Sequence, residues 1–147
     1  MRFEASVNIK ASAEAIWDAV ADPETWPNWT DSISNVKKLS KEPLGVGSKL
    51  DVIISIIIPI KLSVTVTQFN PMEQVVIEGK VLFDKMTRYY KLKPQNGYTR
   101  AVAGGEITGP LSPLAWLFGQ VISEKILRDL KTRIDATFQE GDNSTSR

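Results

Sequence analysis

The 147-residue sequence contains neither cysteine nor histidine, and these two absences remove several kinds of chemistry. Without cysteine the chain can form no disulfide, no thiolate nucleophile and no cysteine-ligated metal site. Without histidine it lacks the commonest general base and the commonest ligand of transition metals. The sequence therefore argues against a zinc enzyme and against a hydrolase of the Ser-His-Asp type, and we expect neither a metal site nor a cofactor.

The chain also lacks an excess of charge and a long apolar run. Its formal net charge is +1, and only Lys37, Lys38 and Lys41 hint at a basic strip, so we expect no nucleic-acid partner. The uncharged run at residues 111–123 is too short to span a bilayer, which predicts no stable membrane insertion. No apolar signal segment stands at the N-terminus, so a cytoplasmic location is expected.

The composition is that of an ordinary globular protein, with 42% hydrophobic and 24% charged residues. A chain of this length is expected to bury about two-thirds of its unfolded surface in one domain. We place that domain at residues 1–140. Residues 141–147 are polar and are interpreted as a frayed, disordered tail.

The residues from Ser112 to Gln139 are predicted to form one long helix around which the rest of the chain folds. Pro113 fits the first helical position, Ser112 fits the N-cap, and Gly141 fits a stop signal. An apolar stripe recurs every three or four residues along this segment. The stripe consists of Leu114, Leu117, Phe118, Val121, Ile122, Ile126, Leu127, Leu130, Ile134 and Phe138. We expect the uncharged first half to be buried on most sides and the second half to keep one face in water.

Between the N-terminus and this helix the pattern is mostly that of β-strands. Residues 2–10 alternate between apolar and polar, and Ser12 and Asp22 then fit the N-caps of two short helices that end near residue 29. Further strands are expected near residues 33–41, 49–58, 61–69, 75–79, 86–93 and 98–108, separated by turn sequences. Because strands do not alternate regularly with helices, the sheet is predicted to be antiparallel.

The last two strands are predicted to form a hairpin across residues 94–97, with Lys93 opposite Tyr98. In this register one face carries Met86, Arg88, Tyr90, Leu92, Ala101, Ala103 and Gly105. Small residues let a helix approach closely, so this face is predicted to point toward the long helix, with Arg88 and Tyr90 as its polar groups. An ion pair of Arg88 with Asp51, Glu78 or Glu106 would explain a buried arginine equally well.

Three short sequences, in their order and spacing, are similar to those of a known superfamily. They are IKASAEAIW at residues 9–17, WPNW at residues 26–29 and VTQFNP at residues 66–71. Over residues 1–140 the chain resembles the START-like helix-grip superfamily, in its polyketide cyclase/dehydrase and coenzyme Q-binding branch (SRPBCC). The resemblance implies an α+β fold with a seven-stranded antiparallel sheet wrapped around the C-terminal helix and two short helices after the first strand.

The resemblance also implies a cavity between sheet and helix that holds a lipid, a polyketide, a quinone or another small apolar molecule. Our first hypothesis is therefore a binding or carrier protein. The expected ligand-binding residues are Trp26, Trp29, Val64, Val66, Ile77, Arg88, Tyr90, Ala103, Trp116, Leu117 and Gln120. Because the small residues of the sheet remove volume, we expect a cavity of roughly 300–1,000 Å³, with Arg88 anchoring a carbonyl or carboxylate. For the two tryptophans, packing in the core under a loop is an equally good interpretation.

Two alternatives remain open from the sequence. The first is a polyketide cyclase or dehydratase in which Arg88 polarises a carbonyl and Tyr90 donates a proton. No spacing demands this arrangement and no catalytic residue can be assigned, so a binder is favoured over an enzyme. The second is a protein-interaction module that uses the strand from Lys49 to Ile58. That strand is apolar on both faces and needs cover on its outer side, which leaves open a homodimer.

Overall fold

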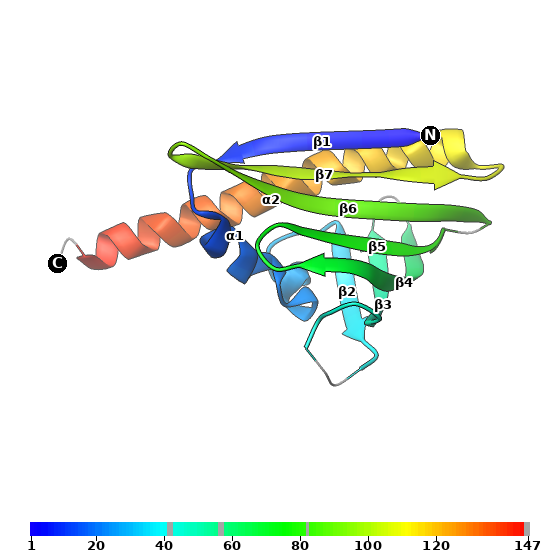
Figure 1. Cartoon of the computed structure of the whole chain (residues 1–147), viewed down its shortest axis with the longest axis horizontal. Helices are drawn as coiled ribbons and strands as arrows, with labels where there is room; N and C mark the ends of the chain where they lie inside the picture. Colours follow the sequence, from blue (N-terminus) through cyan, green and yellow to red (C-terminus); the bar gives the residue numbers. More distant parts are fainter. Residues whose placement is uncertain (41–42, 56–57, 82, 146–147) are drawn as a thin grey trace.

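The chain folds into a curved antiparallel sheet, two short helical segments and one long C-terminal helix (Figure 1). The computed structural model describes residues 1–40, 43–55, 58–81 and 83–145, with side chains described up to Thr137. The elements are β1 (Arg2–Ile9), α1 (Ala13–Val20), η1 (Pro23–Asn28), β2 (Ile33–Lys38), β3 (Lys49–Ser55), β4 (Pro59–Asn70), β5 (Gln74–Val81), β6 (Asp84–Gln95), β7 (Tyr98–Thr108) and α2 (Ser112–Thr145). The predicted helix-grip architecture is confirmed.

The strand order, β1-β7-β6-β5-β4-β3-β2, determines which segment covers which part of the sheet. β1 and β2 lie at opposite edges, so the chain crosses the concave face through α1 and η1 before it returns strand by strand to β7. α2 then packs along β1 and β7, while η1 packs on β2. In Figure 1, α1 and the segment after it accordingly lie between α2 and the strands of the far edge.

The two short helical segments begin as their sequences predict, but they differ in type. Ser12 Oγ accepts a hydrogen bond from the Ala15 backbone N–H at 3.2 Å and caps α1. Asp22 Oδ1 accepts from the Glu24 N–H at 3.3 Å, and Pro23 follows it at the start of η1. η1 is a 3₁₀ helix rather than an α-helix, because it is only six residues long and contains Pro27, which has no N–H for a helical ladder.

α2 is longer than predicted, since it continues through Gly141 to Thr145. The prediction of a stop at Gly141 is wrong, because a glycine within a helix costs only about 1 kcal/mol and does not by itself end it. The helix begins beside Asp84, a fully buried residue whose Oδ1 accepts a hydrogen bond from the Leu111 N–H at 3.1 Å. Gly109, at φ 147°, leaves the space that this carboxylate occupies. No helix in the described ranges is both long enough and apolar enough to cross a membrane.

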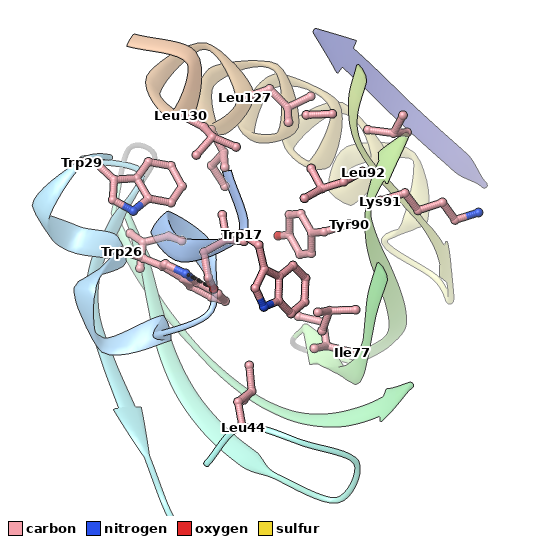
Figure 2. A pocket seen from close by; sticks show the side chains of 16 residues that line it. Trp17, Trp26, Trp29, Leu44, Ile77, Tyr90, Lys91, Leu92, Leu127 and Leu130 are labelled. Atoms are coloured by element: carbon pink, nitrogen blue, oxygen red, sulfur yellow. Dashed lines mark hydrogen bonds between the residues drawn. The ribbon is translucent and has the colours of Figure 1, made fainter. Parts of the chain in front are cut away.

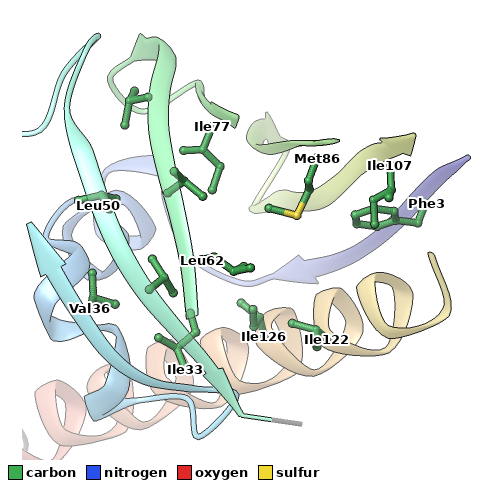
Figure 3. Close-up of a cluster of buried hydrophobic side chains, with 13 residues drawn as sticks. Phe3, Ile33, Val36, Leu50, Leu62, Ile77, Met86, Ile107, Ile122 and Ile126 are labelled. Carbon is green, nitrogen blue, oxygen red and sulfur yellow. The ribbon is translucent and has the colours of Figure 1, made fainter. Parts of the chain in front are cut away.

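The uncharged first half of α2 is not buried on most sides. Leu114, Leu117 and Val121 are 55%, 50% and 50% exposed, because the sheet covers only one side of the helix here. On that covered side Gly119 lies against Phe3, so closely that a methyl group at Gly119 would come within 3.0 Å of the ring. The close approach buries Ile122 and Ile126 in the main apolar core, shown in Figure 3.

The second half of α2 packs against the small residues of β7. Leu127, Leu130 and Ile134 are buried in one cluster with Ala101, Ala103, Ile9 and Ile16. The alanines therefore bring the helix close to the sheet, as small residues at a packing contact do. Ala103 leaves no empty space beside it, whereas Ala101 borders the cavity described below, so small residues on this face do not by themselves predict a large cavity.

The β6–β7 hairpin has the predicted faces but not the predicted register. Lys93 pairs with Arg100, and the connection is a tight turn at residues 96–97 with Gly97 at φ 79°. The shift of two residues preserves the alternation of side chains between faces, so Arg88 still shares the inner face with Gly105 opposite it. Pro59 begins β4, and Ile56 and Ile57 of the predicted strand at residues 49–58 lie outside the described residues.

Candidate functional site

A cavity of about 70 Å³ lies between the middle of the sheet, the two short helical segments and the second half of α2 (Figure 2). Nearly all the atoms that face it are apolar. Its lining consists of Trp17, Val20, Trp26, Trp29, Ile33, Leu44, Val75, Ile77, Tyr90, Lys91, Leu92, Ala101, Val102, Ile126, Leu127 and Leu130. Figure 2 shows Trp26 and Trp29 on the side opposite Tyr90 and Leu92 of β6, with the Trp17 ring next to Tyr90 in this view.

Three tryptophans line the cavity and make different contacts, and Trp26 and Trp29 form the wall opposite Tyr90. The Trp17 ring of α1 packs against Phe69, with ring centroids 5.6 Å apart. Trp26 Nε1 donates a hydrogen bond to the Val20 carbonyl at 3.0 Å, which ties η1 to the end of α1. Trp29 Nε1 is buried and has no hydrogen-bond partner among the described atoms. This wall therefore presents large apolar rings and one unused donor.

A second, smaller cavity of about 20 Å³ adjoins the first. Five residues line both, namely Trp26, Ile33, Ile77, Tyr90 and Ile126. The smaller cavity extends toward Val64 of β4, Met86 of β6 and Arg88. A ligand that displaced the shared side chains could therefore reach from the tryptophan wall to Arg88.

Arg88 is a buried cation, only 4% exposed. One guanidinium nitrogen, Nη2, donates a hydrogen bond to Ser123 Oγ at 2.7 Å, and that hydroxyl donates in turn to the Gly119 carbonyl at 2.7 Å. The guanidinium carbon lies 5.5 Å from the centre of the Phe3 ring and 5.3 Å from that of Tyr90, within cation–π range. Arg88 Nε is buried without a partner among the described residues.

The interpretation that Arg88 forms an ion pair with a nearby carboxylate is wrong. Asp51 pairs with Lys61 at 3.6 Å, and Glu106 pairs with Arg2 at 3.8 Å. Within the part of the chain that the structure describes, no carboxylate lies at ion-pair distance from Arg88. Both pairs use residues whose side chains alternate away from the inner face, which leaves Arg88 without a counter-charge.

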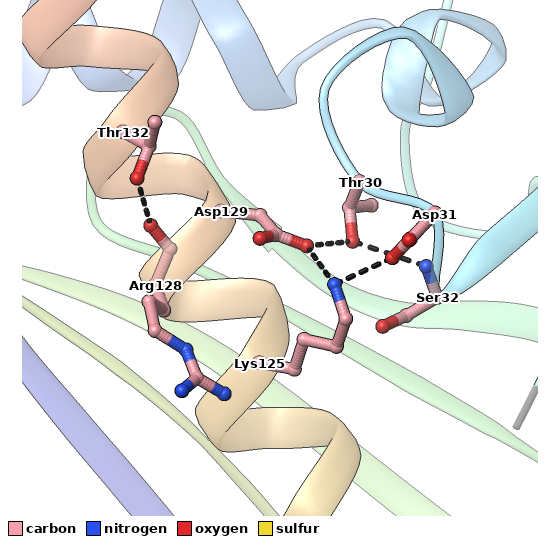
Figure 4. Close-up of polar contacts among 7 residues, drawn as sticks. All are labelled: Thr30, Asp31, Ser32, Lys125, Arg128, Asp129 and Thr132. Carbon is pink, nitrogen blue, oxygen red and sulfur yellow. Dashed lines mark hydrogen bonds and ion pairs between the residues drawn. The ribbon is translucent and has the colours of Figure 1, made fainter.

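A polar cluster on α2 holds the segment that follows Trp29 (Figure 4). Asp129 Oδ2 accepts a hydrogen bond from Thr30 Oγ1 at 2.7 Å and pairs with Lys125 Nζ at 2.8 Å. Lys125 also pairs with Asp31 at 2.5 Å. The Lys125 ammonium holds the pKa of the Asp31 carboxyl below its ordinary value, and hydrogen bonds to Asp129 and Asp31 raise the pKa of Lys125. The cluster thus fastens the end of the tryptophan wall to the long helix.

The outer face of the sheet carries a separate pair, in which the Tyr89 hydroxyl donates to Glu4 Oε2. Burial, followed by the hydrogen bond to Glu4, raises the pKa of Tyr89 to about 12. Neither residue lines either cavity.

Six of the residues predicted to bind a ligand lie at these cavities. Trp26, Trp29, Ile77 and Tyr90 line the larger one, and Val64, Arg88, Trp26, Ile77 and Tyr90 line the smaller one. Val66 and Ala103 point inward but are packed in the core, with 1% and 0% exposure, and line neither cavity. For Ala103 the reason is that α2 occupies the space next to it.

Trp116, Leu117 and Gln120 line neither of the two cavities. Gln120 instead holds the edge strand β1, since its Oε1 accepts from the Glu4 N–H at 3.2 Å and its Nε2 donates to the Glu4 carbonyl at 3.0 Å. Trp116 Nε1 donates to the Arg2 carbonyl on the same strand. These side chains satisfy backbone groups that an edge strand would otherwise leave unpaired.

The cavity also differs from the prediction in size and in place. At about 70 Å³ it lies below the predicted 300–1,000 Å³. It faces the charged half of α2 rather than the uncharged half, through Ile126, Leu127 and Leu130. Sequence reasoning placed these three in the helix stripe without assigning them to the cavity, and it missed Trp17. Its position next to the buried Ile16 on α1 was the available signal.

Comparison with known proteins supports the fold over nearly the whole chain. A structure from Thermus thermophilus is similar with a TM-score of 0.78 and 16% identity, covering 93% of this chain and 99% of that one. A START superfamily protein from Mycobacterium smegmatis gives a TM-score of 0.77 and 19% identity, covering 92% and 98%. The Zhui aromatase/cyclase of a Streptomyces species gives a TM-score of 0.78 and 11% identity, covering 92% and 93%.

Sequence relatives cover much less. Uncharacterised proteins of Mycobacterium bovis and Mycobacterium tuberculosis are 35% identical over 46 residues, which is 31% of this chain and 28% of the length of each relative. A family model described as polyketide cyclase/dehydrase and lipid transport matches residues 1–137. On this match, which spans almost all of the sheet and α2, the chain belongs to the polyketide cyclase/dehydrase and lipid transport family.

Proposed function

We propose that this protein binds and carries a small apolar molecule in the cavity between the sheet, η1 and the second half of α2. The observation that carries the proposal is the nearly continuous apolar lining, which includes three tryptophans, two of them, Trp26 and Trp29, opposite Tyr90. Ligand sites are typically concave and apolar, with few polar groups that set orientation. The family description, which includes lipid transport, supports the same class of ligand, with lipids, polyketides and quinone-like molecules as candidates.

The ligand we propose is larger than the space of about 70 Å³. Binding therefore displaces side chains, and those shared by the two cavities are the first candidates because their movement joins the two spaces. Trp26 is one of them and belongs to the short η1 segment. We expect entry of a ligand to change the environment of the tryptophans, which makes their fluorescence the natural signal.

A binding role is favoured over a cyclase or dehydratase by the residues at the cavities. Among the described lining residues, the ionisable ones are Arg88, Tyr90 and Lys91, and none is a carboxylate. A general base is therefore missing beside the proton donor and the cation that such a mechanism would use. Arg88 and Tyr90 are instead stacked, with the guanidinium 5.3 Å from the ring centre.

The test is the binding of N-phenyl-1-naphthylamine, a neutral dye whose fluorescence rises in apolar surroundings, to the purified full chain. Val75 of β5 lines the cavity, while its neighbour Val76 lies on the opposite face of the same strand and lines neither cavity. The variants Val75→Trp and Val76→Trp thus add the same bulk to neighbouring positions, one inside the cavity and one outside it.

We expect saturable dye binding with quenching of tryptophan emission in the native protein. Val75→Trp should weaken binding about tenfold or more because the added ring fills the cavity, and Val76→Trp should leave it within about twofold. Equal weakening by both variants would place the dye elsewhere, and absence of dye binding to the native protein would refute the proposed function.

A further inference from the structure

The charge of Arg88 is incompletely matched by the protein around it. A guanidinium carries several N–H donors and no acceptor. The described contacts give this one a single hydrogen bond, to the neutral hydroxyl of Ser123, while its Nε has no partner. Buried cations are normally paired with a negative group, because burial removes the water that otherwise stabilises the charge.

The neighbours of Arg88 cannot supply that negative charge. Ser123 is fully buried and already donates its own proton to the Gly119 carbonyl. Phe3 and Tyr90 offer ring faces, which attract a cation but accept no hydrogen bond of ordinary strength. The carboxylates of Asp31 and Asp129 are engaged by Lys125.

Arg88 borders the ligand space. Arg88 lines the smaller cavity, and the rest of that lining is aliphatic or aromatic. The smaller cavity shares five lining residues with the larger one. A molecule in the larger cavity would therefore reach Arg88 by displacing these shared side chains.

We propose that Arg88 is the binding site for the carboxylate of an apolar carboxylic acid, whose hydrocarbon part occupies the larger cavity. The inference rests on the proposed function and specifies its ligand. A carboxylate can accept hydrogen bonds from Nε and a neighbouring Nη at once. It carries one negative charge, which matches the single cation of this lining, whereas a phosphate dianion would leave a buried negative charge unbalanced.

The test compares three ligands with the same chain and different head groups on the native protein at neutral pH. Octanoate, octan-1-ol and octylamine each compete with N-phenyl-1-naphthylamine. A purely apolar cavity prefers the alcohol, because the carboxylate loses more hydration on entry. A cavity with Arg88 as its anchor prefers octanoate, and we expect octanoate to bind about tenfold more tightly than octan-1-ol, with octylamine the weakest.

Variants then assign the preference to Arg88. Arg88→Met removes the charge and keeps a long apolar side chain, so octanoate should lose its advantage while the neutral dye still binds. Arg88→Lys keeps the charge but loses the planar fork, and should retain a reduced preference for octanoate. The matched control is Arg100→Met on β7, an exposed arginine that donates to Ser6 on the outer face and should leave all three affinities unchanged.

Each outcome decides between the two proposals. If the dye binds the native protein and octan-1-ol competes as well as octanoate, the carboxylate site is refuted while the proposed function stands. A preference for octanoate that survives Arg88→Met refutes it equally. If neither the dye nor any of the three ligands binds, both proposals fail. Should Arg88→Met not fold, the comparison on the native protein and on Arg88→Lys still gives the answer.

Discussion

Truncating the buried face of α2 should destabilise the protein far more than truncating its exposed face. Leu130 and Ile134 are each 4% exposed and pack with Ile9 and Ile16 in one apolar cluster. Lys131 lies between them in sequence but points to solvent. The variants Leu130→Ala, Ile134→Ala and Lys131→Ala therefore remove side-chain atoms from adjacent turns of one helix, in two different environments.

The expected loss in the free energy of unfolding is about 2–5 kcal/mol for Leu130→Ala and for Ile134→Ala, the range for large-to-small changes in a core. Leu130 also lines the cavity, so it has fewer neighbours to lose, and we expect its truncation in the lower half of that range. Lys131→Ala should change stability by less than about 0.5 kcal/mol, as exposed substitutions do. At roughly 2–4 °C per kcal/mol, the buried truncations lower the melting temperature by roughly 4–20 °C.

The assay is urea unfolding followed by tryptophan fluorescence, with the midpoint compared at constant slope. A change in slope would show that a variant alters the unfolded state or the cooperativity, and such a variant would be compared by calorimetry instead. Equal losses at all three positions would refute the assignment of the buried face of α2, and so would losses below about 1 kcal/mol at both Leu130 and Ile134.

Three further predictions concern the polar cluster, the outer face and the helix contact. Lys125→Met should remove a contribution to stability that is present between roughly pH 4 and pH 10. This contribution is lost as pH falls through the lowered pKa of Asp31, and also as pH rises through the raised pKa of Lys125. The melting temperatures of the native protein and the variant should therefore converge in acid. Tyr89, with its pKa raised to about 12, should ionise at higher pH than an ordinary tyrosine in a phenolate absorbance titration. Its protonated form contributes stability below about pH 10, and this contribution is lost as pH rises toward 12. Glu4→Gln should lower the pKa of Tyr89 without restoring the ordinary value, since the burial of the ring remains. Gly119→Leu should cost about 1–3 kcal/mol in urea unfolding, because even a methyl group there would meet the Phe3 ring at 3.0 Å; an unchanged midpoint would contradict the close contact.

Much of the fold could be predicted because its signals are local. Alternation between apolar and polar residues identified the strands, and turn sequences separated them. The inward direction of Arg88 was predicted correctly although the hairpin register was not, since a shift of two residues preserves the faces of a strand. The register itself depends on a tight turn around Gly97, which the sequence Pro-Gln-Asn-Gly does not define uniquely.

The site was predicted less well because it depends on how elements pack. A helical stripe shows which residues of α2 face the sheet, but it does not show where along the helix the packing is incomplete. Ala103 illustrates this limit, since a small residue can either leave a space or admit a helix, and here it admits α2. Gln120 shows another, because only the position of β1 at the sheet edge gives its side chain a role.

η1 and Trp29, on one side of the cavity, are held less firmly than α2 on another side. This difference affects how the protein accommodates a ligand larger than about 70 Å³. α2 is held by an apolar cluster of fully buried side chains. Trp26 lies in a six-residue 3₁₀ helix and Trp29 caps the end of that helix, and both rings are only partly buried. Its attachment to α2 includes the polar contacts of Thr30, Asp31 and Asp129 around Lys125, and exposed ion pairs contribute little to stability. Local opening draws on the least stable contacts of a fold. The space for a ligand is therefore expected to come from displacement of η1, with α2 and the Arg88 site staying in place.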